Sequence, residues 1–192
     1  MIGMGRVGAS LAGTLNSLGH DVLGVDCDED RIQDLSTELP NASLVAADAT
    51  ERTVLRDLGL EQFDGAAVVI GEDIEASVLV TLILKDLGVP LVFSRASSPL
   101  HARVLERIGA DHVVQPEKEF GEFLARQITS PGMKDYLELG RDEALIEMEV
   151  PREWIGKSLA DLQLHRKKEL TVLAVKGEGQ EGSLPRPEAP LK

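Results

Sequence analysis

The feature that most constrains this chain is the alternation, over its first 130 residues, of short β-branched segments with longer amphipathic segments. Such alternation is typical of βαβ units, in which parallel strands share one sheet and the connecting helices cover its faces. The expected strands are Asp21–Asp26, Ala42–Ala47, Gly65–Ile70, Pro90–Arg95 and Asp111–Gln115. The expected helices are Arg6–Leu18, Asp28–Leu39, Glu51–Leu58, Ile74–Leu87 and Pro99–Ile108. The sequence therefore predicts an α/β protein with a doubly wound parallel sheet.

The pattern changes after a sixth expected helix, Glu117–Ile128. We expect a larger domain over residues 1–129, a crossover linker over residues 130–142, and a small, partial α+β subdomain over residues 143–192. The elements expected in this last part are an alternating strand at Ala144–Val150, a helix at Lys157–Leu162 and a strand at Leu170–Lys176. Both ends look incomplete, because only Met1 and Ile2 precede Gly3, where the sheet needs a strand. Either a fragment or a misplaced start codon explains this.

A glycine motif, G-x-G-x-x-G, occupies Gly3, Gly5 and Gly8. In a Rossmann-like domain the first glycine permits a tight turn, the second admits a pyrophosphate, and the third lets the helix pack closely on the strand. The helix that follows offers its N-terminal amides to phosphate. Asp26 ends the next strand 18 residues after Gly8, close to the spacing of the carboxylate that binds ribose hydroxyls. Alternatively, Asp26 only caps the helix that begins near Asp28.

Further candidates follow the strands of the predicted sheet, at the edge where parallel strands bind ligands. Asp48, Ala49 and Thr50 follow the second of the five expected strands, within reach of an adenine or a ribose, although Thr50 is also a candidate N-cap of the next helix. Gly71 follows the third expected strand. Cys27 comes directly after Asp26 and is interpreted as a small buried residue at the edge of the cofactor site.

Two arginines are predicted at the same edge. Arg6 lies within the glycine motif beside Val7, and Arg95 ends the fourth expected strand. A diphosphate is already served by the helix amides, so two further guanidinium groups match an additional or terminal phosphate. The alternative is that both arginines are solvated and pair with the abundant carboxylates.

The net charge of the chain restricts the classes of partner that it is expected to bind. With 20 Lys and Arg against 33 Asp and Glu, the net charge is −13, which disfavours a nucleic-acid partner. One cysteine excludes a disulfide framework. There is neither an apolar run long enough to span a bilayer nor a leader segment, so direct membrane insertion is not expected and a cytoplasmic location is predicted.

Catalytic groups are not recognisable in the sequence. The only tyrosine, Tyr136, has no lysine four residues later, and the four histidines are scattered without metal-ligand spacing. A nucleotide site without such groups favours a sensor over an enzyme. An NAD-dependent oxidoreductase remains an alternative, as does the cytosolic domain of another ion channel or exchanger.

Several segments together resemble a known family, the RCK or KTN (TrkA-N plus TrkA-C) domains, and in particular the regulatory subunits of Trk/Ktr-type potassium uptake systems. The resemblance is carried by Gly3–Gly8, Val25-Asp26, Asp48-Ala49-Thr50, Arg103–Asp111, Pro116–Glu119 and, in the C-terminal subdomain, Ala144–Lys176. It implies a cytosolic, non-catalytic subunit that senses a nucleotide and gates a potassium transporter from the inner face of the membrane.

The resemblance also implies a ligand and an assembly. Adenine nucleotides, ATP and ADP or NAD(H), are expected at the glycine motif, with Arg6 and Arg95 near the outer phosphates; the family position of Arg95 is often a lysine. Glu117 is implied to hold a divalent ion, Mg or Ca, at a dimer interface. The resemblance further implies homodimers that assemble into a ring beneath a membrane potassium-translocating subunit. Because the C-terminal subdomain is shortened, the sequence does not decide whether a second ligand binds there.

Overall fold

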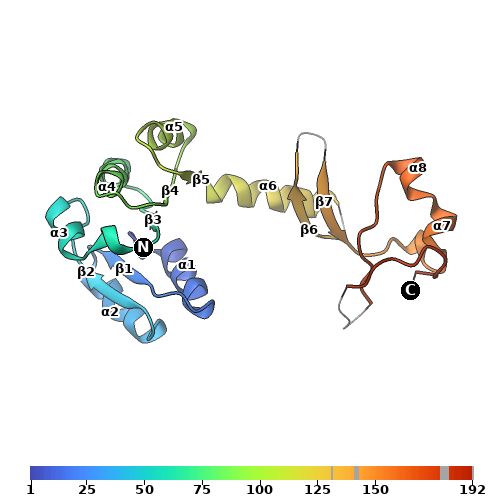
Figure 1. The fold of residues 1–192 in the computed structure, drawn as a ribbon, viewed down its shortest axis with the longest axis horizontal. Coiled ribbons are helices and arrows are strands. Elements are labelled where there is room, and N and C mark those ends of the chain that lie inside the picture. The colour runs from blue at the N-terminus through green and yellow to red at the C-terminus, as the bar shows by residue number, and fades with distance from the viewer. Residues whose placement is uncertain (131, 141–142, 178–181, 192) are drawn as a thin grey trace. The chain divides into compact units, whose positions relative to one another are not determined.

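Parallel strands and their connecting helices build the N-terminal part of the computed structural model (Figure 1). The structure describes residues 1–130, 132–140, 143–177 and 182–191, which separate into two units, Met1–Glu119 and Phe120–Lys192. The strands of the first unit are β1 (Leu23–Asp26), β2 (Ser43–Ala46), β3 (Ala66–Val68), β4 (Val92–Arg95) and β5 (His112–Val114). Its helices are α1 (Arg6–Ser17), α2 (Glu29–Glu38), α3 (Arg52–Asp57), the 3-10 turn η1 (Leu60–Gln62), α4 (Ile74–Asp86) and α5 (Pro99–Arg107).

The N-terminal residues join two groups of strands into one sheet. β1 pairs with β2, and β3 pairs with β4, which pairs with β5, all in parallel. Ile2 bridges Val25 on one side and Val68 on the other, and its N–H donates to the carbonyl of Ala67 at 2.8 Å. Figure 1 shows the N-terminus between β1 and β3. The prediction of a doubly wound parallel sheet is confirmed, and Ile2 lies between β1 and β3 in that sheet.

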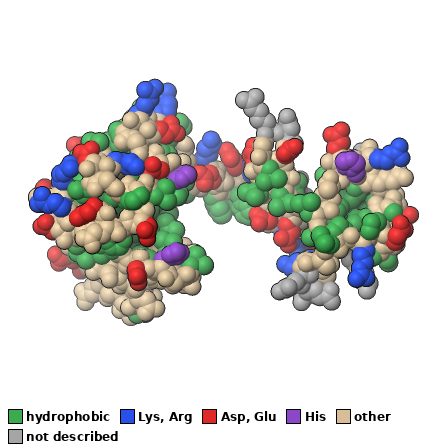
Figure 2. All heavy atoms as spheres, viewed as in Figure 1, with side chains coloured by type: hydrophobic (Ala, Val, Ile, Leu, Met, Phe, Trp, Pro, Cys, Tyr) green, Lys and Arg blue, Asp and Glu red, His purple; other side chains and the backbone are tan. Residues whose placement is uncertain are grey.

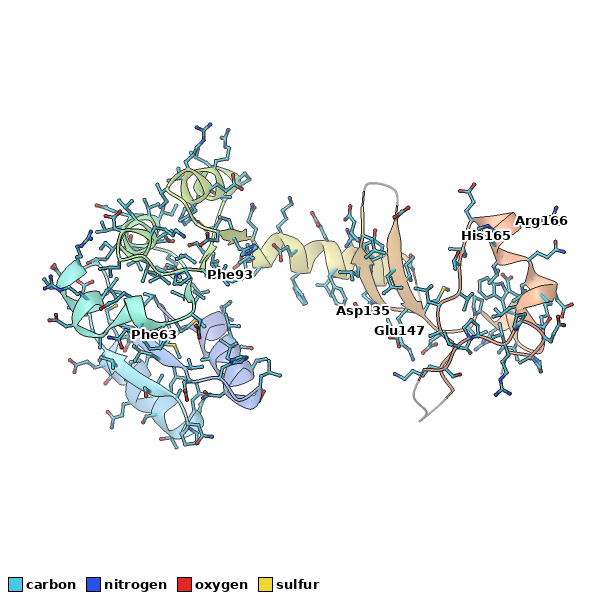
Figure 3. All side chains as sticks on the ribbon, in the orientation of Figure 1. Phe63, Phe93, Asp135, Glu147, His165 and Arg166 are labelled. Atoms are coloured by element: carbon cyan, nitrogen blue, oxygen red, sulfur yellow. The ribbon has the colours of Figure 1, made fainter. Side chains whose placement is uncertain are left out.

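The core of the first unit lies between the sheet and its helices. Alternate residues of the two central strands β3 and β4 are buried, and among them Val68 of β3 and Val92 of β4 pack with Val80 and Leu84 of α4. Burial of such aliphatic side chains contributes roughly 1.5–3 kcal/mol each. Phe93 alternates to the other face of β4, where it stacks on His112 with ring centroids 4.5 Å apart (Figure 3).

α6 (Pro116–Thr129) begins in the first unit and continues into the second. The second unit contains the antiparallel pair β6 (Met133–Glu138) and β7 (Ala144–Met148), the 3-10 turn η2 (Arg152–Trp154), and two short helices, α7 (Leu159–Leu162) and α8 (Leu164–Lys168). α7 begins with a capping box between Ser158 and Asp161. The predicted strand Ala144–Val150 and helix Lys157–Leu162 thus have counterparts in β7 and α7.

Two expectations for the C-terminal part differ from the structure. β6 lies within residues 130–142, where a linker without regular structure is expected, because pairing with β7 supplies hydrogen bonds that periodicity does not reveal. Conversely, the apolar segment Leu170–Lys176 is not a strand and forms only an isolated bridge, between Val175 and Ser183. A β-branched segment becomes a strand only beside a partner that satisfies its backbone along its length. Residues 178–181 lie outside the described residues.

Candidate functional site

Each of the three motif glycines occupies its position for a different structural reason. Gly3 has φ +91°, in the left-handed region that favours glycine. A Cβ on Gly8 would lie 2.0 Å from the carbonyl oxygen of Gly3, so only glycine allows α1 to approach the strand. A Cβ on Gly5 would meet no atom within 4 Å. The space beside Gly5 is therefore open, as required where a phosphate approaches the backbone.

The start of α1 suits an anion. Gly5 is its N-cap, no side chain caps the first turn, and that turn holds no acidic residue. The first N–H groups of a helix have no partner within it and carry a partial positive charge. Arg6 is exposed, and its guanidinium forms no hydrogen bond or ion pair with another described residue. Val7 beside it is 36% exposed. The first turn of α1 and the Arg6 side chain therefore present hydrogen-bond donors and positive charge at this loop.

Asp26 is buried beside this loop at the end of β1. Its Oδ2 accepts a hydrogen bond from the Met4 N–H at 2.6 Å, and its Oδ1 accepts from the Asp28 N–H at 3.0 Å. Burial disfavours its charged form, but these two amides and Arg31 outweigh burial and hold the pKa of Asp26 below its usual value. The N-cap of α2 is Asp28, which accepts from the Arg31 N–H, so Asp26 is not a helix cap.

Arg31 was not recognised in the sequence, although it belongs to this site. From the first turn of α2, its Nη1 lies 3.1 Å from Oδ1 and 3.0 Å from Oδ2 of Asp26, and its Nη2 lies 3.1 Å from Oδ2 of Asp28. The carboxylate of Asp26 is the main reason that the pKa of Arg31 is raised. The available signal was the position of Arg31 three residues after Asp28, one helical turn along.

The residues after β2 form a local turn. Oδ1 of Asp48 accepts from the N–H of Thr50 at 2.9 Å and from its hydroxyl at 2.6 Å, which lowers the pKa of Asp48. Thr50 does not cap α3, whose N-cap is Glu51. Ala49 is buried. Cys27 is exposed, so its interpretation as a buried residue is wrong: β1 ends at Asp26, and the next side chain leaves the core.

Gly71 and Arg95 lie together at the ends of β3 and β4. A Cβ on Gly71 would lie 2.9 Å from Nη1 of Arg95, so the guanidinium passes directly over this glycine. Arg95 forms an ion pair with Glu117 in the first turn of α6, and its buried Nε has no partner among the described atoms. A hydrogen bond from the backbone N–H of Glu117 itself, together with Arg95, lowers the pKa of Glu117. Arg6 and Arg95 therefore differ, because of the two only Arg95 forms an ion pair with a described residue.

A metal ion at Glu117 is not supported by the donors of a single chain. The described residues contain no group of three or more His, Cys, Asp or Glu side chains arranged to hold a metal ion. Among the described residues, the Glu117 carboxylate forms its ion pair with a cation, Arg95.

A glycine loop open beside Gly5, with a buried carboxylate at the end of the neighbouring strand, is the arrangement by which Rossmann-like domains hold nucleotides. The first unit is a domain of this class. Its residues 1–116 match the TrkA-N domain, and the chain belongs to that family.

Several relatives are potassium uptake proteins by name. The chain is 39% identical to Ktr system potassium uptake protein C of Bacillus subtilis (strain 168) over 176 residues, which cover 92% of this chain and 79% of the relative. It is 35% identical to Ktr system potassium uptake protein A of Vibrio alginolyticus, with the same coverage of both chains.

Solved structures share the fold. The GsuK channel bound to NAD superposes with a TM-score of 0.73 at 18% identity, covering 99% of this chain and 34% of that one. The NAD(P)-binding domain of an exopolyphosphatase-related protein from Archaeoglobus fulgidus superposes with a TM-score of 0.59 at 27% identity, covering 67% of this chain and 94% of that one. The described residues include no helix that is long and apolar enough to cross a membrane.

Proposed function

We propose that this protein is a cytosolic, nucleotide-sensing regulatory subunit of a potassium uptake system. The observation that carries the proposal is the open space beside Gly5 at an uncapped helix N-terminus, with Arg6 unengaged next to it. The relatives are named as potassium uptake proteins and not as enzymes, in agreement with the predicted non-catalytic role. A potassium-translocating membrane subunit is the partner that such a regulator needs.

The proposed ligand is an adenine nucleotide, either ATP and ADP or NAD(H). Support comes from the GsuK structures that share this fold, one of which is bound to NAD and another to ADP. The helix amides and the glycine backbone serve a diphosphate, and Arg6 is available for a third phosphate. A ligand changes the shape of the assembly only through the difference in its affinity for the two shapes. Nucleotides that differ in the third phosphate regulate the protein if Arg6 contacts them differently in those shapes.

Calorimetric titration of the wild type and of Arg6→Ala with ADP and ATP tests this proposal. We expect the wild type to bind both nucleotides and Arg6→Ala to bind ATP about tenfold more weakly, the effect of one charge-assisted contact. The affinity for ADP should change much less. Arg52→Ala is the matched control, because it removes an exposed arginine on α3 that pairs with Asp86. Absence of binding by the wild type contradicts the proposed function, and equal losses for both nucleotides contradict the role of Arg6.

We also propose that the protein is a homodimer that assembles further into a ring. No described side chain of α6 is buried, yet the helix exposes Phe120, Phe123, Leu124 and Ile128, with Ile128 76% exposed. Exposed apolar patches of this kind mark interaction surfaces.

Acidic and basic side chains are interspersed on the face of the first unit seen in Figure 2. This face therefore lacks the continuous basic surface that a nucleic-acid partner requires.

Light scattering should give a mass of at least two chains for the wild type at micromolar concentration. Ile128→Asp should shift the protein towards the monomer, because a charge placed in an apolar interface is costly to bury. Leu18→Asp is the control, since Leu18 is also exposed but lies outside α6, directly after α1. A wild-type monomer, or equal effects of the two variants, argues against α6 as the dimer surface.

A further inference from the structure

We propose that Arg31 occupies the ribose-binding positions of Asp26, and that the ribose diol must displace it. Arg31 is thereby a specificity-determining residue of the nucleotide site. The inference rests on the proposed nucleotide binding and concerns how the site selects the sugar.

The argument begins with the acceptor capacity of the carboxylate. Two carboxylate oxygens offer about four acceptor positions. In Asp26 each oxygen already accepts one backbone N–H, from Asp28 at Oδ1 and from Met4 at Oδ2. The one position left on each oxygen is taken by Nη1 of Arg31, at 3.1 and 3.0 Å. The carboxylate is therefore saturated within this chain.

A ribose diol needs the same two positions. It presents adjacent hydroxyl donors, whereas the amides of Met4 and Asp28 belong to the backbone that shapes the loop and α2. Arg31 is the exchangeable partner, because its side chain is 44% exposed while that of Asp26 is 6% exposed. Asp28 gives the guanidinium a second carboxylate, already 3.1 Å from Nη2, to which it remains bound after release.

The exchange has a measurable consequence. In the wild type, the contact of a 2′-hydroxyl with Asp26 is offset by the loss of an Arg31 contact. Without Arg31 the same hydroxyl bonds a carboxylate oxygen that is otherwise left to water. Removal of Arg31 should therefore strengthen the discrimination between a ribose and a 2′-deoxyribose, even though it removes a positive charge that attracts every phosphate ligand.

The test is calorimetric titration of wild type, Arg31→Ala and Arg31→Lys with ADP and 2′-deoxy-ADP. The readout is the ratio of the two dissociation constants, in which the general effect of charge on the diphosphate cancels. We expect this ratio to rise about three- to fivefold in Arg31→Ala, the size of a partly exposed ion-pair contact. Arg31→Lys should lie between it and the wild type, because one ammonium cannot span both oxygens as the guanidinium does.

Arg56→Ala is the control for loss of a surface arginine, since Arg56 on α3 pairs only weakly, with its neighbour Asp57 at 3.8 Å. A ratio in Arg31→Ala that stays unchanged or falls overturns the inference, and a fall identifies Arg31 as a group that orients Asp26 for the sugar. If the wild type binds neither nucleotide, the proposed function itself fails, which is a different result from an unchanged ratio. Unaltered thermal unfolding of the variant shows that a changed ratio does not arise from misfolding.

Discussion

Gly8→Ala should destabilise the protein by about 3 kcal/mol or more and abolish nucleotide binding. The added Cβ would lie 2.0 Å from the carbonyl oxygen of Gly3. The backbone fixes the positions of both atoms, so no flexible side chain can move aside to relieve the clash. Overpacking of a core typically costs 1–3 kcal/mol, and a clash between two backbone segments that join α1 to the sheet belongs at or above the top of that range. Denaturant unfolding measures the loss of stability, and titration with ADP measures the loss of binding.

Gly5→Ala is the matched control in the same loop. Gly5 has φ −67°, which any residue adopts, and a Cβ there meets nothing within 4 Å. Its unfolding free energy should change by less than about 1 kcal/mol, because only the N-cap preference is affected. Nucleotide binding should still be weakened, since the methyl group enters the space proposed for the phosphate. Equal destabilisation by the two substitutions would show that the clash at Gly8 is relieved by a movement of α1.

Asp26→Asn should be the next most severe substitution, with a loss of about 2–3 kcal/mol in stability and a large loss in nucleotide affinity. Every group that contacts the Asp26 carboxylate is a donor: the N–H groups of Met4 and Asp28, and the guanidinium of Arg31. Asparagine presents an NH₂ group to one side of this set, which leaves buried donors unsatisfied and the charge of Arg31 unpaired. Chemical denaturation and ADP titration measure both effects.

Asp86→Asn serves as the control for this substitution. Asp86 pairs with Arg52 at 2.9 Å, but both side chains are about half exposed, so a loss of less than about 1 kcal/mol is expected. If Asp26→Asn is as mild as Asp86→Asn, the buried carboxylate does not organise the loop.

The pH dependence of the same carboxylate provides a further check on this prediction. Because the folded state lowers the pKa of Asp26, the unfolded chain binds its proton first as the pH falls. The stabilisation is fully present above the unfolded pKa of about 4, and it is lost as the pH falls through the lower folded value. The stability difference between the wild type and Asp26→Asn should therefore shrink below about pH 4. A difference that stays constant into that range contradicts a charge-based role.

The alternation of apolar segments was enough to locate the elements of the first unit. Helix α4, expected at Ile74–Leu87, runs from Ile74 to Asp86, and strand β4, expected at Pro90–Arg95, runs from Val92 to Arg95. These elements are determined by near neighbours in sequence, because a helix bonds residues four apart and a buried strand needs consecutive apolar, β-branched residues. The spacing from Gly8 to Asp26 likewise follows from the fixed length of one helix and one strand.

The tertiary structure alone decided which charged groups are engaged. Arg6 and Arg95 are equivalent in the sequence argument, yet Arg95 meets Glu117, 22 residues later in the chain, whereas Arg6 meets no described partner. Arg31 became part of the site because the first turn of α2 brings its guanidinium to the Asp26 carboxylate at the end of β1. β6 exists because β7 lies beside it, and Leu170–Lys176 lacks such a partner. Ion pairs and strand pairing depend on the distances between separate elements, and no local sequence pattern specifies those distances. Periodicity and glycine spacing, by contrast, reflect geometry within one element or between two consecutive elements.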